Sequence, residues 1–269
     1  MNKTIILCFL IATNLISSTF IGNKTFPKKN HIITYSEQNL STKEIDWYIV
    51  PNKNNLPPEP NKEALPILQN FNGYYIGDTQ KKVLYLTFDE GYENGYTSQI
   101  LDTLKKHNVP AAFFVVRTYI KTNPDLILRM VNEGHLVCNH SSHHPSMAKV
   151  IDPNKFNKEF SEVEEEYKKV TNQDMPKFFR PPMGKFSEQS LKMTKDLGYK
   201  SIFWSFAYKD FDIKNQPSHE KAQNTIMSRI HNGSIILLHA VSKTNTEILD
   251  NILTTLKSQG YEFRSLTDF

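Results

Sequence analysis

The chain alternates short apolar runs with longer segments whose apolar residues recur every three or four positions. The first clear run, from Val83 to Phe88, is rich in aliphatic and aromatic residues and ends at an acidic residue, Asp89. Such a run predicts a buried β-strand. Six later runs have the same character, so strands are predicted at residues 83–89, 111–116, 136–140, 178–180, 200–205, 234–239 and 261–263.

The segments between these strands predict amphipathic helices. In the first of them, Ile100, Leu101 and Leu104 fall on one side of a helix, and Gly134 is a stop signal for the second. Alternating strands and helices imply parallel strands joined by right-handed crossovers, in a barrel or an open sheet. Helices are predicted at residues 98–107, 125–133, 153–171, 188–197, 219–230 and 247–259.

The N-terminal part has a different composition. Residues 1–22 place Lys3 before an apolar run and small residues, which predicts an export signal or, as the alternative, an uncleaved membrane anchor. The apolar run is short for a stable membrane span. Residues 23–80, rich in Asn, Lys and Pro, predict an irregular arm whose apolar patch, 47–50, docks on the main domain. The main domain is expected at 81–269, and the export signal predicts a secreted or extracytoplasmic protein.

Charge and cysteine content narrow the function classes. The net charge of the 269 residues is +4, and its Lys and Arg residues are dispersed, which argues against nucleic-acid binding. Removal of the N-terminal segment leaves Cys138, which excludes an intramolecular disulfide. Cys138 lies in an apolar run and is expected to be a small core residue. We expect a monomer.

Polar residues recur where the predicted strands end: Asp89, His140, Arg180 and His239. In parallel α/β folds the carboxyl ends of the strands meet at one edge and carry the active site. The coincidence of these four residue types with strand ends therefore indicates an enzyme.

The residues around His140 and Asp89 suggest a metal site. His140 and His144 are four positions apart, so a helical turn would put both imidazoles on one face as half of a transition-metal site, with His143 pointing away. Two such histidines can equally be surface or capping residues. Asp89 and Glu90 could divide the work of metal ligand and base, or be solvated loop acids.

Two further strand ends carry candidate chemistry. Two prolines stiffen the loop after Arg180, which could aim this side chain and a backbone N–H at a reacting centre, or form a plain turn. His239 at a strand terminus could donate a proton, or be a structural histidine.

Together and in this order, these strings resemble the polysaccharide deacetylases, which share the NodB homology domain of carbohydrate esterase family four. The resemblance covers roughly residues 80 to 265. It implies a distorted (β/α) barrel of about seven parallel strands, forming a single catalytic domain. The matching strings are Thr87-Phe88-Asp89, His140-Ser141-x-x-His144, Arg180-Pro181-Pro182-x-Gly184 and Leu237-Leu238-His239.

A finer match points to one branch of the family. The strings around Gly91–Tyr96, His143–Pro145 and Phe203–Ser205 resemble the delta-lactam-biosynthetic enzymes, which deacetylate N-acetylmuramic acid in the peptidoglycan of spore-forming bacteria. The resemblance thus implies peptidoglycan glycan strands as the partner, and a role in the cell wall and in sporulation.

The resemblance implies a divalent metal cation, such as zinc, manganese or cobalt. His140 and His144 would bind it, and Glu90 stands where most of the family has a metal-ligating Asp. The extra methylene of Glu moves the carboxylate by about 1.5 Å, as judged from ordinary bond lengths. Glu is still a competent oxygen ligand, so Glu90 is expected as the third protein ligand, in a site that binds the metal more weakly than usual.

Acid–base roles also follow from the resemblance. Asp89 would be the general base, oriented by Arg180. His239 would protonate the leaving amine, oriented by Asp210.

The resemblance places three residues in the substrate pocket. Leu237 and Phe211 would line the small acetyl pocket, and the backbone N–H near Met183 would stabilise the oxyanion. Phe211 stands where the family usually has Trp, and Met183 where it usually has Tyr; the N–H survives the second change.

Two other functions stay open. The first is deacetylation of an N-acetylglucosamine-containing glycan, chitin or acetylated xylan, against which the Gly91–Tyr96 segment argues. The second is a catalytically weak wall-binding protein that keeps the fold, for which Glu90 is the support.

Overall fold

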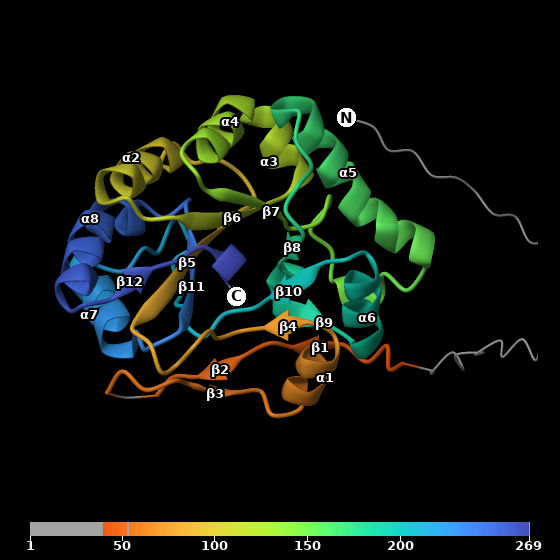
Figure 1. Ribbon diagram of the computed structural model, residues 1–269, viewed down its shortest axis with the longest axis horizontal. Helices are drawn as coiled ribbons and strands as arrows, with labels where there is room; N and C mark the ends of the chain where they lie inside the picture. Colours follow the sequence, from red (N-terminus) through yellow and green to blue (C-terminus); the bar gives the residue numbers. More distant parts are fainter. Residues whose placement is uncertain (1–39, 53, 269) are drawn as a thin grey trace, which may run out of the picture. The chain divides into compact units, whose positions relative to one another are not determined.

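The computed structural model describes residues 40–52 and 54–268 (Figure 1). The predicted export signal or anchor at residues 1–22 lies outside this range. No helix within the described range has both the length and the apolar character needed to span a bilayer.

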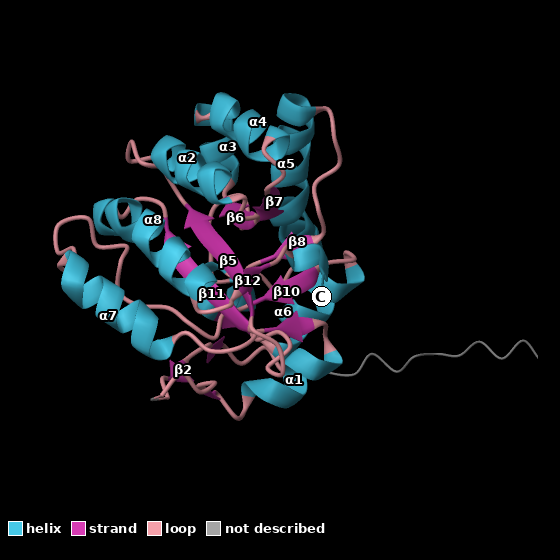
Figure 2. Ribbon diagram, turned by 60° about the vertical axis from the view of Figure 1, so that its left-hand side comes forward, coloured by secondary structure: helices cyan, strands magenta, loops and turns pink. Residues whose placement is uncertain are grey.

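A curved parallel sheet forms the centre of the described part of the chain (Figures 1 and 2). Seven of its strands, counted over residues 40–268, lie in the order β11-β5-β6-β7-β8-β10-β4, and β12 pairs with the start of β5. An isolated bridge between Ile76 and Ser234 links the two ends of this order. The predicted distorted (β/α) barrel is therefore confirmed. The strands are β4 (Gly73–Tyr74), β5 (Val83–Glu90), β6 (Ala111–Val115), β7 (Leu136–Asn139), β8 (Phe178–Phe179), β10 (Lys200–Ile202), β11 (Ser234–His239) and β12 (Glu262–Phe263).

Helices cover the outside of this sheet (Figure 2). Each predicted helix is present, and two short ones, α1 and α3, were not predicted. Their few residues do not complete enough turns for a periodic pattern to stand out. The helices are α1 (Ala64–Asn70), α2 (Thr97–His107), α3 (Arg117–Thr122), α4 (Pro124–Asn132), α5 (Pro153–Thr171), α6 (Glu188–Asp196), α7 (His219–Arg229) and α8 (Lys243–Ser258), with 3₁₀ turns η1 (Met147–Lys149), η2 (Pro182–Gly184) and η3 (Leu266–Asp268).

The α8 helix begins four residues earlier than predicted. Its first turn, Lys-Thr-Asn-Thr, is polar and carries no apolar periodicity. The Ser242 side chain caps it by accepting a hydrogen bond from the backbone N–H of Asn245. Such a cap satisfies one of the free N–H groups of the first turn.

The two faces of the strands have different surroundings. Leu84, Leu86 and Phe88 of β5 belong to the large core between the sheet and the outer helices. Val83 and Tyr85 belong to the smaller core inside the barrel, which also holds the buried Cys138, as predicted. Because side chains alternate along a strand, the inner face of β5 continues to Asp89.

The segment before the barrel packs against its lower part (Figure 1). Trp47 of this arm is buried against Phe203 and Tyr75, and its backbone N–H donates to the carbonyl of Gly184. Tyr48 and Val50 are exposed, so the expected apolar patch docks mainly through Trp47. The short strands here are β1 (Ile45–Asp46), β2 (Ile49–Val50) and β3 (Glu59–Pro60), and β1 pairs with β9 (Lys185–Phe186).

The close packing at the amino-terminal end of β11 can be tested at Gly233, with Gly134 after α4 as the comparison. Gly233 and Gly134 both have positive φ, of 74° and 82°, but a Cβ on Gly233 would lie 2.8 Å from the backbone of Gly77, whereas one on Gly134 meets nothing within 4 Å. We expect Gly134→Ala to lower the free energy of unfolding by about 1 kcal/mol through φ strain, and Gly233→Ala by about 2–4 kcal/mol through strain and the clash. Urea unfolding measures both. Equal losses would contradict the close approach of the two backbones.

Candidate active site

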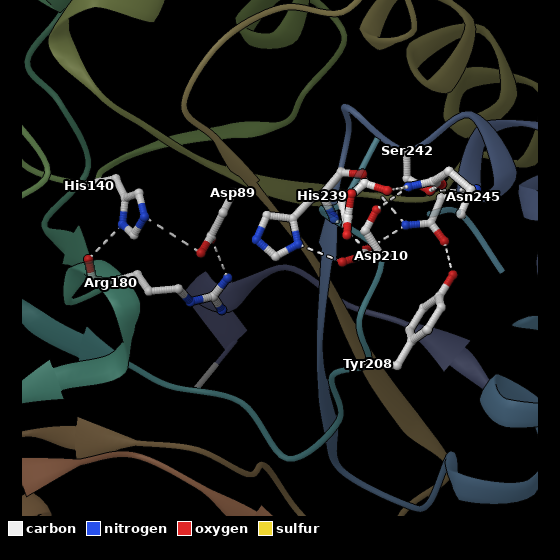
Figure 3. A network of polar contacts seen from close by, with 10 residues as sticks. Asp89, His140, Arg180, Tyr208, Asp210, His239, Ser242 and Asn245 are labelled. Carbon is white, nitrogen blue, oxygen red and sulfur yellow. Dashed lines mark hydrogen bonds and ion pairs between the residues drawn. The ribbon is translucent and has the colours of Figure 1, made fainter. Parts of the chain in front are cut away.

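Three polar side chains project from the inner face of the barrel at the carboxyl ends of its strands. Asp89 is the second-last residue of β5, His140 follows β7 and His239 ends β11. In register, His239 lies beside Asp89 on the neighbouring strand. Figure 3 shows Asp89 between the two histidine rings. The strand-end residues that the sequence singled out are thus brought together.

Asp89 is held by a buried arginine. The Arg180 side chain is fully buried and donates from Nη1 to Oδ1 of Asp89 at 2.7 Å. Its other nitrogens donate to the carbonyls of Ile202 and Phe203, and its plane lies over the ring of Phe114. Burial alone would raise the pKa of Asp89, but the charge of Arg180, with those of His140 and His239, outweighs it and leaves the pKa below its ordinary value. Asp89 is therefore ionised at neutral pH.

His140 and His144 form the second part of the site. Their ring centroids are 4.9 Å apart, and Nε2 of His140 lies 3.6 Å from Oδ2 of Asp89. The Nδ1–H of His140 donates to the carbonyl of Arg180 at 2.7 Å, which leaves the Nε2 lone pair facing the site. Burial lowers the pKa of His140 to about 4 and also lowers that of His144. Both rings are therefore neutral at physiological pH, which is the form that binds metals.

The turn between these histidines is not the predicted helical turn. Ser141 and His144 have φ of 68° and 57°, so two left-handed residues, rather than helical spacing, bring the rings together. The Ser141 hydroxyl accepts a hydrogen bond from the His144 backbone N–H. His143 points away, as predicted: its side chain is exposed and pairs with Glu159 of α5.

Glu90 does not join the two histidines. It follows Asp89 in β5 and therefore lies on the outer face, with Leu86 and Phe88. Its side chain is fully buried, and within the described residues neither carboxylate oxygen has a hydrogen-bond partner. Burial, then the charges of Glu93 and Asp89, raise its pKa well above the ordinary value. The sequence-based assignment of Glu90 as a metal ligand is therefore not supported by the geometry.

His239 is paired with a buried aspartate. Its Nδ1–H and its backbone N–H donate to Oδ1 and Oδ2 of Asp210, at 2.7 and 2.8 Å (Figure 3). Burial acts to lower the pKa of His239, but the hydrogen bond and charge of Asp210, and the charge of Asp89, leave the pKa above its ordinary value. The imidazole thus keeps its proton to higher pH than a free histidine, with Nε2 toward the pocket.

These groups open into one pocket with a largely apolar wall. The three residues expected in it, Met183, Phe211 and Leu237, all line it, and the Phe211 ring lies 5.6 Å from that of His239. Met183 has φ of 59°. The sequence did not assign the other wall residues to the pocket, because glycine, small aliphatic and aromatic residues are equally common in turns and cores. These are Gly91, Tyr92, Gly184, Trp204, Ala207, Tyr208 and Val241.

The arrangement offers an ionised carboxylate, an imidazole with a raised pKa and two neutral imidazoles around one pocket. Within residues 40–268, no cluster of three or more His, Cys, Asp or Glu side chains has the spacing to enclose a metal ion. The histidine pair and the adjacent Asp89 still supply nitrogen and oxygen donors suited to a divalent cation. Such a set is suited to hydrolysis with acid and base on opposite sides of the scissile bond.

Comparison with known proteins agrees with the resemblance seen in the motifs. The family model described as polysaccharide deacetylase matches residues 76–202. The peptidoglycan-N-acetylmuramic acid deacetylase PdaA of Bacillus subtilis is 44% identical over 83% of this chain and 85% of its own length. An uncharacterised protein of Geobacillus stearothermophilus is 48% identical over 85% of this chain and 86% of its own length.

The solved structure of Bacillus subtilis PdaA, a family 4 carbohydrate esterase, matches the fold with a TM-score of 0.82 and 42% identity, over 85% of this chain and 97% of that one. The barrel, the order of the motifs along it and these relatives lead to one conclusion: the chain belongs to the polysaccharide deacetylase family.

Proposed function

We propose that the protein hydrolyses the N-acetyl group of N-acetylmuramic acid in peptidoglycan. The observation that carries this proposal is the placement of an ionised Asp89 and a proton-bearing His239 on neighbouring strands, facing one pocket. A hydrolase of amide bonds needs a base for water and an acid for the amine, and the lowered pKa of Asp89 and the raised pKa of His239 favour these two roles.

A divalent cation fits beside this pair. His140 and His144 would hold it through neutral ring nitrogens, close to Asp89. When bound there, the cation supplies a Lewis acid that polarises the acetamide carbonyl and makes water a better nucleophile. The backbone carbonyl of Arg180 keeps the His140 ring in the ligand orientation.

The chain's own groups divide the remaining chemistry. Asp89, held by Arg180, takes a proton from the attacking water. The backbone N–H of Met183 stabilises the negative charge that develops on the carbonyl oxygen. His239 gives its Nε2 proton to the departing nitrogen as the C–N bond breaks, so the products are acetate and a free amino sugar. Leu237 and Phe211 exclude water from the acetyl methyl.

Two observations favour muramic acid over the other sugars. The relative with 44% identity is named for N-acetylmuramic acid, and the Gly91–Tyr96 segment resembles the corresponding segment of the lactam branch. In that branch the freed amine cyclises on the lactyl carboxyl, which would place the protein in spore-cortex formation, outside the cytoplasmic membrane. A glucosamine-specific deacetylase is the second candidate, and mass spectrometry of digested glycan strands distinguishes the two by which sugar loses acetyl.

Replacing the base tests the reaction directly. We expect Asp89→Asn to lower acetate release from peptidoglycan by about 10²–10⁴-fold, because an amide cannot accept the proton of water. Acetate is measured enzymatically, and circular dichroism checks the fold. Asp102→Asn, an exposed aspartate on α2, is the matched control and should keep full activity. Undiminished release by Asp89→Asn would refute the base assignment, and wild type without release would favour a wall-binding protein.

The pH dependence tests the acid. The active form carries a proton on His239, so activity is lost as pH rises through the raised pKa of this residue. Asp210→Asn removes the carboxylate that raises this pKa, so we expect the alkaline limb of kcat/KM to move to lower pH by about 1 unit. Asp212→Asn in the same loop contacts Asn215 rather than His239 and should leave the limb in place. A limb unmoved by Asp210→Asn would remove His239 from this role.

Metal content tests the histidine pair. After dialysis against a stated zinc concentration, elemental analysis should give loss of bound metal in His140→Ala and retention in His143→Ala, since His143 faces away from the pocket. Glu90→Gln should also retain its metal, because this side chain lies on the outer face of β5. Loss in Glu90→Gln would contradict that placement, and equal content in wild type and His140→Ala would argue against the site.

A further inference from the structure

Behind the His239–Asp210 pair lies a buried amide, that of Asn245 in the first turn of α8. Its Nδ2 donates to Oδ2 of Asp210 at 2.6 Å, the same oxygen that accepts the backbone N–H of His239 (Figure 3). Asp210 is fully buried, and the Asn245 side chain is nearly so. Both oxygens of Asp210 therefore accept hydrogen bonds: His239 donates to each of them, and Asn245, which does not line the pocket, donates to Oδ2.

The chemistry of the partners fixes the orientation of this amide. A carboxylate accepts only, so the NH₂ end of Asn245 must face Asp210. The Oδ1 end then faces the hydroxyl of Tyr208, which donates to it. Reversal would bring an amide oxygen against the carboxylate and leave Asp210 without this donor, so the network has a single satisfied arrangement.

Asn245 is also anchored through its backbone. Its N–H donates to the capping hydroxyl of Ser242, which in turn donates to the Gln216 side chain. Gln216 donates to the backbone carbonyls of Asp210 and Asp212. The α8 terminus and the Asp210 loop are thus joined by two separate connections, one through the Asn245 amide and one through Gln216.

We infer that Asn245 is a positioning residue for the acid: its amide, oriented by Tyr208, holds the Asp210 carboxylate turned toward His239. This inference rests on the proposed function, in which His239 is the proton donor. Asn245 lies behind Asp210 and acts on the reaction mainly through it, since its only direct contact with His239 among the described residues is a long one, from Nδ2 to the backbone carbonyl at 3.5 Å.

The amide of Asn245 also affects how strongly the Asp210–His239 pair binds its proton. A neutral N–H donor stabilises the negative charge of Asp210, so the carboxylate holds the imidazolium proton less tightly. Without the amide, the Asp210–His239 pair should bind its proton more strongly, and the imidazolium should be a weaker acid. The other charged or titratable groups that act on His239 or are acted on by it are Asp89, Arg180 and His144, and a change at Asn245 leaves them in place.

Asn245→Leu removes the amide with little change in volume and is the main test. We expect the pKa of His239, followed by NMR of histidine-labelled protein and assigned with His239→Gln, to rise by about 0.5 unit or more. We expect kcat for acetate release to fall about tenfold with KM within about twofold, because the sugar does not touch Asn245. Tyr208→Phe, which removes one hydroxyl, should shift the pKa in the same direction by less, and serves if Asn245→Leu fails to fold.

Thr246→Val is the matched control. Thr246 is the next residue in α8, and its hydroxyl donates to the carbonyl of Ser242 without touching Asp210. We expect it to change thermal stability alone, with His239 unshifted. An unshifted or lowered pKa of His239 in both Asn245→Leu and Tyr208→Phe would overturn the inference. The NMR result decides this even if the wild type releases no acetate, in which case it is the proposed function that fails.

Discussion

The buried ion pair between Arg180 and Asp89 is the interaction on which the site depends. A fully buried guanidinium is stable only if its charge is balanced and its N–H groups are hydrogen-bonded. Here Asp89 balances the charge, and two backbone carbonyls accept hydrogen bonds from the other nitrogens. The same residue also offers its own carbonyl to His140. Asp89, the proposed base, and His140 are therefore positioned by opposite ends of one residue, and the rigid Pro-Pro loop that follows limits how far either can move.

Strand alternation decides which of two adjacent acids reaches the pocket. Asp89 shares its face with Tyr85 and finds Arg180, whereas Glu90 shares its face with Phe88 and is buried beneath the helices. The environment then separates their charge states: nearby cations lower the pKa of Asp89, and burial beside other acids raises that of Glu90. Two carboxyl groups one peptide apart thus differ in protonation at the same pH.

The sequence predicted the main strands and helices because their apolar periodicity reflects burial, and it predicted Asp89, His140, Arg180 and His239 because parallel strands gather their carboxyl ends. It did not predict β4, because Gly73–Tyr74 lies in the segment 23–80, whose composition was interpreted as an irregular arm. It assigned a helical turn to residues 140–144, because spacing alone does not reveal the left-handed residues Ser141 and His144. Asn245 was missed for a related reason: a polar first turn of a helix resembles a loop, and only the folded structure shows what its side chain meets.

The arm before the barrel has a role in the pocket that its irregular sequence does not suggest. Trp47 binds the carbonyl of Gly184 through its backbone and that of Trp204 through its indole, and both partners line the pocket from within. The wall that faces the sugar is thus supported from behind by a segment outside the (β/α) repeat. A change in the arm therefore acts on this wall through two hydrogen bonds, and an arm exchanged between relatives without its matching wall would leave Gly184 and Trp204 without their native support.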